Sequence, residues 1–444
     1  MLKFQLDHAL TLQNLARVCE YETCAAGLVF PAGTRGGAGE QVFVIRGFRE
    51  VPEQAYLERT RSGASLRPEF CTELGNRARA AGAGVVIAHT HVGRNPLQSF
   101  SHVDDRGEVA LANYFDRRLG TGVNFAAVFT AETVHARSLG AGMAHKVVFV
   151  GKNLVQNLVS GSCVSETHDR QVRAFGAAGQ KALARLRVGV IGLGGTGSVV
   201  AQQLAHLGVS SFLFIDPDVV DITNLNRLVG ATPDAVGQPK VTVARRLVTA
   251  INPLAECAEL QGDVADDNVA RSLLDMSFVF CCTDSMASRA VLNQLAYQYL
   301  IPCIDMGVGI GADKGRIQYV SGRVQMLSAG LPCLVCTEKL DGEQVRQEML
   351  TEEQRVADPY IQGAAVAQPA VISLNSTVAS AAVTMFLSAV TGIPSAARML
   401  TYDGMLGTLR AAAMEPRPHC VACSEDGALG RAASWSLPTR RGGA

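Results

Sequence analysis

The sequence of 444 residues is longer than a single ordinary hydrophobic core supports, so two domains are expected. Hydrophobic residues make up 48% of it and charged residues 18%, a balance typical of a globular enzyme with buried sheets. Forty basic residues match forty acidic ones, and no lysine or arginine run resembles a nucleic-acid-binding tract, which argues against nucleic acid as a partner.

The start of the chain lacks the apolar core of a secretory signal, since Asp7 and His8 appear early. The uncharged stretch 363–397 is expected to be a buried helix rather than a membrane span, because polar residues such as Asn375 recur along it. Twelve cysteines without a secretory signal indicate a reducing compartment. We therefore expect a cytoplasmic enzyme with no membrane partner.

The first 155 residues are predicted to form an α/β domain. Helices are expected over 10–18, 67–81 and 108–119, and strands over 40–47, 85–88 and 124–129. The strand 85–88 runs directly into His89-Thr90-His91. Two histidines at positions i and i+2 of an extended segment point to the same side, which suits a shared metal ion.

Ser101 and Asp104 follow downstream of these histidines. Two imidazoles and one carboxylate form a common catalytic zinc set, which leaves a coordination position for water. Zinc lowers the pKa of such a water molecule, and the water can then attack a carbonyl group if a carboxylate base lies beside it.

The residues Glu22, His89-x-His91 and Ser101-x-x-Asp104 resemble the pattern of JAMM (Mov34/MPN/JAB) metalloproteases, which cleave after ubiquitin or ubiquitin-like tails. The resemblance implies a JAB/MPN-like domain in which His89, His91 and Asp104 bind zinc. It also implies that Glu22 is the general acid/base and that Ser101 stabilises the oxyanion.

The spacing departs from this family pattern. Nine residues, 92–100, separate the second histidine from Ser101, more than is usual, and Val92 stands where the family usually has proline. The usual gap would select Ser99 and His102 instead. We assign Ser101 and Asp104, because the local motif is kept and a loop accommodates an insertion easily. The alternative is a metal-free docking domain.

The second domain is expected to follow a polar linker, 151–166, and to contain a nucleotide site. The β-branched run 187–191 is typical of a buried parallel strand. It is followed by an amphipathic helix and by a second strand, 212–215, that ends in Asp216. Between the first strand and the helix lies the motif G-x-G-x-x-G: Gly192, Gly194 and Gly197. This unit places a phosphate at a helix N-terminus, and by itself it indicates NAD more often than ATP.

The residues that follow favour ATP over NAD. Arg227 and Lys240 come after the second strand, and Asp284 follows a strand expected over 278–281. Arginine and lysine neutralise a polyphosphate, and a carboxylate holds Mg²⁺. A dehydrogenase needs none of these groups.

These motifs, spread over about residues 165–425, resemble the adenylation domain of ubiquitin-activating enzymes and of bacterial ThiF-type adenylyltransferases. The resemblance implies a Rossmann-like fold in which the three glycines shape the phosphate turn, Asp216 binds the ribose of ATP and Asp284 holds Mg²⁺. It implies phosphate contacts from four residues: Asn224, Asn226, Arg227 and Lys240. Arg170 would reach into the site of a partner subunit, which implies a homodimer.

Two cysteine pairs, Cys333-x-x-Cys336 and Cys420-x-x-Cys423, predict a structural Zn²⁺ site. A redox CxxC is the alternative, but two pairs favour a closed Cys₄ site, and the bacterial adenylyltransferases carry the same pairs.

The segment 337–369 contains no cysteine, whereas ubiquitin-activating enzymes carry their nucleophilic cysteine there. We therefore expect an acyl-adenylate product and no thioester. A mobile loop over the substrate tail is expected at 341–358, and a disordered tail at 429–444.

The preferred interpretation joins both domains on one substrate class, a ubiquitin-like protein with a glycine-ending tail. Residues 1–155 would cleave tails or conjugates, and residues 156–428 would adenylate the exposed carboxylate. An E2-like or sulfur-carrier protein would then take the product. Two alternatives remain: an adenylyltransferase for sulfur transfer with a non-catalytic docking domain, and a nicotinamide oxidoreductase.

Overall fold

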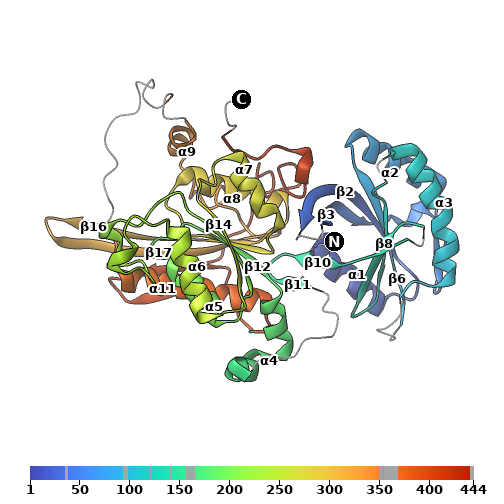
Figure 1. Cartoon of the computed structure of the whole chain (residues 1–444). Helices are drawn as coiled ribbons and strands as arrows, with labels where there is room; N and C mark the ends of the chain where they lie inside the picture. The colour runs from blue at the N-terminus through green and yellow to red at the C-terminus, as the bar shows by residue number, and fades with distance from the viewer. Residues whose placement is uncertain are drawn as a thin grey trace. The chain divides into compact units, whose positions relative to one another are not determined.

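The computed structural model describes residues 1–35, 39–93, 99–120, 122–140, 142–156, 166–350, 354 and 369–440. The chain divides into two compact units, and Figure 1 labels many of their elements. The first unit contains residues 1–159 with the short segments 298–300 and 428–436, and the second contains the remainder. We describe each unit separately.

The described part of the first unit is built on a nine-stranded sheet of order β11-β10-β1-β3-β2-β6-β7-β8-β9. Its strands are β1 (Leu2–Gln5), β2 (Cys24–Arg35), β3 (Glu40–Glu50), β6 (Gly84–Thr90), β7 (Phe125–Phe129), β8 (Val134–Ser138), β9 (Ala144–His145), β10 (Val147–Val150) and β11 (Leu154–Gln156). Its helices are α1 (Leu6–Val18), α2 (Pro68–Ala80) and α3 (His102–Leu119), and a hairpin, β4 (Tyr56–Thr60) and β5 (Gly63–Leu66), follows the 3₁₀ turn η1 (Glu53–Ala55). Phe4 lies at the centre of the core, with Phe48 and Phe129 packed edge-on against it at ring distances of 5.2 and 6.0 Å.

Two expectations for this unit change. Helix α3 begins at His102 rather than at 108, because Ser101 is its N-cap and forms a capping box with Asp104. The start of the expected linker, 151–156, contains the strand β11, while residues 157–165 lie outside the described residues.

The described part of the second unit is built on an eight-stranded sheet of order β14-β13-β12-β15-β16-β17-β18-β19. Its strands are β12 (Arg187–Ile191), β13 (Ser211–Ile215), β14 (Glu256–Leu260), β15 (Phe278–Cys281), β16 (Cys303–Asp313), β17 (Arg316–Leu327), β18 (Met399–Asp403) and β19 (Thr408–Ala411). Strands β14 to β16 pair in parallel, and β16 to β19 pair antiparallel. The chain order reverses between β12 and β15, which is where a doubly wound sheet binds its ligand.

Figure 1 also draws the helices of the second unit. They are α4 (Asp169–Ala184), α5 (Gly197–His206), α6 (Lys240–Ile251), α7 (Asp267–Ser272), α8 (Met286–Gln298), α9 (Gly342–Met349) and α11 (Ile372–Val390). Short 3₁₀ turns are η2 (Glu166–His168), η3 (Ile222–Asn224), η4 (Pro233–Ala235) and η5 (Leu273–Asp275).

Among the described residues, α11 is the one helix long and apolar enough to cross a membrane. It packs on this sheet, with Phe386 in ring contact with Phe278 and Phe280 at 4.9 and 5.4 Å. The core position of α11 agrees with the buried helix expected at 363–397, of which residues 363–368 lie outside the described part.

The expectation of a disordered tail from residue 429 is wrong for 429–440. Ala432, in the 3₁₀ turn η6 (Ala432–Ser434), is fully buried, and the Gln298 side chain donates hydrogen bonds to the carbonyls of Ala432 and Trp435. Leu437 is also buried. A few apolar side chains spaced among small and polar residues are enough to anchor this segment, and composition alone hides them. Residues 441–444 lie outside the described residues.

Candidate functional site

The glycine turn joins β12 to α5 and is determined by steric contacts. Gly192 has φ +83°, and a Cβ there would come within 2.9 Å of the Cys282 backbone. A Cβ on Gly197 would collide with the carbonyl oxygen of Gly192. Gly194 meets nothing within 4 Å, so its backbone is open to an approaching group. Glycine is required at two of these positions for folding and leaves the third free for a phosphate.

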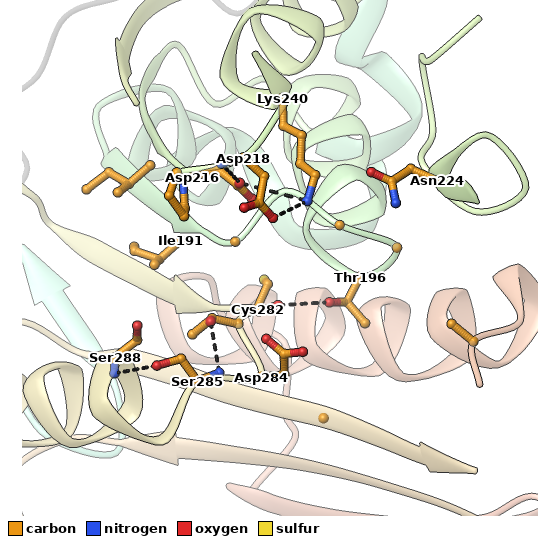
Figure 2. A pocket seen from close by; sticks show the side chains of 18 of the residues that line it. Ile191, Thr196, Asp216, Asp218, Asn224, Lys240, Cys282, Asp284, Ser285 and Ser288 are labelled. Atoms are coloured by element: carbon orange, nitrogen blue, oxygen red, sulfur yellow. Dashed lines mark hydrogen bonds and ion pairs between the residues drawn. The ribbon is translucent and has the colours of Figure 1, made fainter. Parts of the chain in front are cut away.

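The turn borders a cavity of about 760 Å³, drawn in Figure 2, which we call the glycine-turn cavity. Seven of the residues predicted from the sequence line it: Gly192, Gly194, Asp216, Asn224, Arg227, Lys240 and Asp284. Gly197 lies behind the turn at the start of α5. Asn226 is not among the lining residues, and its side chain accepts a hydrogen bond from Arg227. The expected phosphate contact of Asn226 is therefore not supported. Arg170, on α4, does not line this cavity either.

Asp216 supports the turn as well as facing the cavity. Its carboxylate accepts hydrogen bonds from the backbone N–H groups of Leu193, at 2.6 Å, and Asp218, at 2.9 Å. Burial raises the pKa of this carboxyl, and the positive charge of Lys240 partly offsets the increase. Lys240 Nζ lies 2.7 Å from Asp218 Oδ2 and 3.9 Å from Asp216 Oδ1 (Figure 2). Lys240 therefore carries its charge at the wall of the cavity, where it pairs with Asp218.

Asp284 follows β15 on the other side of the strand-order reversal, at the start of the segment that leads into α8. The neighbouring Ser285 donates a hydrogen bond of 2.7 Å to Glu348 Oε2, which also accepts one of 2.9 Å from the N–H of Ala287. Glu348 belongs to α9, and its carboxylate caps the N-terminus of α8. The first part of the expected mobile loop, 341–358, is therefore a helix. Residues 351–353 and 355–358 lie outside the described residues.

Sequence reasoning missed a buried ionic cluster next to this cavity, which we call the Asp305 cluster: Asp305, Arg289 and Arg323. Asp305 is fully buried, with Arg289 Nε 3.2 Å from its Oδ1 and Arg323 paired with its Oδ2. Arg289 also lines the glycine-turn cavity. The cluster fixes a positive charge at the cavity wall. No local motif marks it, because its members come from α8, β16 and β17.

Asn375 was also missed as a site residue. It lines the cavity from α11, and a Cβ on Gly195 would collide with its amide nitrogen. A side chain at position 195 would therefore displace the amide of Asn375, a residue far away in the sequence.

The four cysteines of the two CxxC pairs come together as a buried cluster. The Sγ–Sγ distances are 3.7 Å for Cys333–Cys336, 3.4 Å for Cys333–Cys420 and 3.4 Å for Cys336–Cys423. Zinc–sulfur bonds of about 2.3 Å in a tetrahedron require sulfur atoms roughly 3.8 Å apart. The cluster fits a Zn²⁺ ion with little rearrangement.

A second group that fits a metal lies in the first unit, and we call it the His89 cluster: His89, His91 and Asp104. The Nε2 atoms of the two rings lie 3.1 Å apart, and they lie 3.0 and 3.5 Å from the Asp104 oxygens. His89 lies in the strand β6, His91 follows directly after its end, and the first turn of α3 supplies Asp104. His102 is fully exposed and pairs with Asp105, so it does not join the cluster.

Glu22 lies beside the His89 cluster, with Oε1 4.0 Å from His91 Nε2. Burial raises the pKa of Glu22, and the charges of His89 and His91 partly offset this. Burial also opposes ionisation of Asp104, but hydrogen bonds from the two imidazoles lower the pKa of its carboxyl well below the usual value. Ser101 Oγ donates to Asp104 Oδ2 at 2.7 Å, so in this structure its hydrogen points to the candidate ligand.

A family model described as the ThiF family matches residues 168–422, more than half of the chain. The chain therefore belongs to the ThiF family, and its second unit is an ATP-binding adenylyltransferase domain of that family. The match begins at residue 168 and does not include the His89 cluster. Any role of that cluster is therefore inferred from its geometry.

Three curated relatives illustrate the range of similar proteins. The molybdopterin-synthase adenylyltransferase of Escherichia coli K12 is 29% identical over 262 residues, which cover 58% of this chain and 96% of that protein. The ubiquitin-like modifier-activating enzyme 5 of Drosophila willistoni is 30% identical over 173 residues, 36% of this chain and 42% of its own. The tRNA threonylcarbamoyladenosine dehydratase of Bacillus subtilis is 33% identical over 151 residues, 34% of this chain and 59% of its own.

Proposed function

We propose that the chain adenylates the C-terminal carboxylate of a ubiquitin-like or sulfur-carrier protein that ends in a glycine tail. The observation that carries this proposal is the glycine-turn cavity, whose lining combines a phosphate turn with the cations Arg227 and Lys240 and the carboxylate of Asp284. The names of two relatives, one acting on molybdopterin synthase and one on ubiquitin-like modifiers, support this substrate class.

The reaction follows from the charges in the cavity. A carboxylate oxygen of the tail forms a bond to the α-phosphorus of ATP, and the bond from that phosphorus to the β-phosphate oxygen breaks. Pyrophosphate leaves, and the tail becomes a mixed anhydride. Arg227 and Lys240 neutralise the phosphates, and the N-terminus of α5 attracts them. Asp284 would hold Mg²⁺, which supplies further stabilisation of the charge on pyrophosphate.

ATP–pyrophosphate exchange in the presence of a glycine-tailed ubiquitin-like protein tests this proposal. The Asp284→Ala variant should lose exchange. Asp234→Ala is the matched control, because Asp234 is an exposed carboxylate on η4 that does not line the cavity. Unchanged exchange in Asp284→Ala would contradict the role given to Asp284.

In this proposal the chain acts as a homodimer, and Arg170 of one copy reaches the glycine-turn cavity of the other. Arg170 does not line its own chain's cavity, as a residue acting on a partner's site requires. Exchange should return when an inactive Arg170→Ala chain is mixed with an inactive Asp284→Ala chain, since a mixed dimer then has one complete site. If this mixture stays inactive while wild type is active, Arg170 does not act across subunits.

We further propose that the His89 cluster is a zinc peptidase site that cleaves ubiquitin-like tails or conjugates. Three ligand atoms within 4.8 Å of one another, with a buried carboxylate beside them, support this. Zinc bound there would lower the pKa of a water molecule. Glu22, which lies beside the cluster, would take up a proton from water and release it to the leaving amine. The non-catalytic docking domain remains the competing explanation.

Zinc content separates these explanations. Wild type should contain two zinc ions per chain, and both His89→Ala and Cys420→Ala should contain one. His102→Ala, which changes an exposed histidine, should keep two. If His89→Ala retains the full zinc content, the peptidase proposal fails and the adenylation proposal stands.

A further inference from the structure

The order of strands in the second sheet determines where the base of a nucleotide lies. The phosphate turn follows β12, the proposed ribose ligand Asp216 follows β13, and the next strand outward is β14. A nucleotide that extends along the carboxyl ends of these strands places its base at the residues after β14. Those residues are Gly262, Asp263 and Val264, and all three line the glycine-turn cavity.

Asp263 has one part of its carboxylate left for a ligand. Its Oδ1 accepts hydrogen bonds from the N–H of Ala265, at 2.9 Å, and from Ser288 Oγ, at 3.4 Å, while Oδ2 pairs with Arg440. A carboxylate offers about four acceptor positions, so roughly one remains. The side chain is 34% exposed and borders the cavity.

Arg440 holds Asp263 in this position. Its Nε lies 2.9 Å from Asp266 Oδ1, its Nη1 donates to the carbonyl of Glu348, and its backbone N–H donates to the carbonyl of Ala265 at 2.7 Å. The guanidinium is therefore bound on several sides, and turning Asp263 away would remove one of its two carboxylate partners.

We propose that Asp263, positioned by Arg440, selects adenine over guanine by accepting a hydrogen bond from the 6-amino group of the base. Adenine carries an N–H donor at position 6, whereas guanine carries a carbonyl oxygen there. A carboxylate accepts hydrogen bonds and donates none, so bound guanine would place its 6-oxygen, an acceptor, against the Asp263 carboxylate, which is also an acceptor. This inference depends on nucleotide binding in the glycine-turn cavity, as proposed above. Asp263 is a specificity residue and Arg440 a positioning residue.

Equilibrium binding of three nucleotides to the full chain, with Mg²⁺ and without a protein substrate, tests the inference. The probes are ATP, GTP and purine riboside triphosphate, which lacks the 6-amino group. Wild type should bind ATP about 10- to 100-fold more tightly than purine riboside triphosphate, because one hydrogen bond to a charged group is lost. GTP should bind more weakly still, since sites built for a hydrogen bond reject an analogue that leaves it unmade.

Asp263→Asn should reduce the preference for ATP over GTP by about tenfold or more, because an amide can donate to the guanine oxygen. Asp234→Asn is the control. Asp234 is an exposed residue of η4 and is not among the residues that line the cavity, so that variant should keep the preference. Arg440→Ala should weaken the preference, and Arg440→Lys should restore part of it, because lysine keeps the charge without the planar geometry.

If wild type binds ATP and purine riboside triphosphate with equal affinity, the inference about Asp263 is overturned and the proposed function stays intact. This measurement needs no variant. An unchanged preference in Asp263→Asn would overturn it in the same way. If wild type binds none of the three nucleotides, the proposed function fails, and the inference fails with it.

Discussion

Replacing Asp305 with asparagine is expected to destabilise the second unit strongly. The carboxylate is fully buried, and the side chains of its partners Arg289 and Arg323 are only 12% and 15% exposed. Asp305→Asn removes the negative charge and leaves two largely buried guanidinium groups uncompensated. Breaking a buried ion pair in this way costs about 3–5 kcal/mol. A unit of this size loses about 2–4 °C in melting temperature per kcal/mol, so a decrease of roughly 6–20 °C is expected.

Thermal unfolding followed by circular dichroism measures this decrease. Asp169→Asn is the control: Asp169 forms an exposed ion pair with Arg173 on α4, and removing such a pair costs about 0.5 kcal/mol or less. The double variant Asp305→Asn/Arg323→Met should recover part of the loss, because it removes one of the uncompensated charges. A melting temperature of Asp305→Asn within about 2 °C of wild type would refute the reasoning, as would the absence of recovery in the double variant.

Asp305→Asn should also affect nucleotide binding, since Arg289 lines the glycine-turn cavity and loses the carboxylate that orients it. We expect the Kd for ATP to rise several-fold at temperatures where the variant remains folded. An unchanged Kd would mean that Arg289 does not contact the nucleotide.

Three further predictions concern the glycine-turn cavity, the cysteine cluster and the His89 cluster. Gly195→Ala should weaken ATP binding, measured by equilibrium titration, by about tenfold, equivalent to about 1.4 kcal/mol, because the added Cβ collides with the Asn375 amide. The double variant Gly195→Ala/Asn375→Ala should recover much of the lost affinity in the same titration. Cys423→Ser should lose one zinc ion by elemental analysis and become sensitive to limited proteolysis, whereas Cys257→Ser, outside the cluster, should do neither. Glu22→Gln should keep both zinc ions yet lose cleavage of a ubiquitin-like fusion by a factor of about 10² or more; retained cleavage would remove Glu22 from the mechanism.

The sequence predicted those parts of the site that adjacent residues determine. The β-branched run before Gly192 and the apolar spacing after Gly197 define the strand, turn and helix locally, and each CxxC pair lies within a few residues. Most nucleotide-site residues inferred from the family resemblance line one cavity, and the exceptions are Gly197 and Asn226.

Tertiary structure alone decided the other contacts. Asp263 lines the cavity and pairs with Arg440. Glu348 of α9 accepts a hydrogen bond from the first turn of α8, the helix that follows Asp284. Each of these contacts joins residues that are tens to more than a hundred positions apart, so no local periodicity or motif reports it. The same holds for the segment 429–440, whose small residues resemble a disordered tail until the surfaces that bury them are in place. Local propensity and spacing determine elements and turns, whereas burial and charge pairing between distant segments become visible only when the chain is folded.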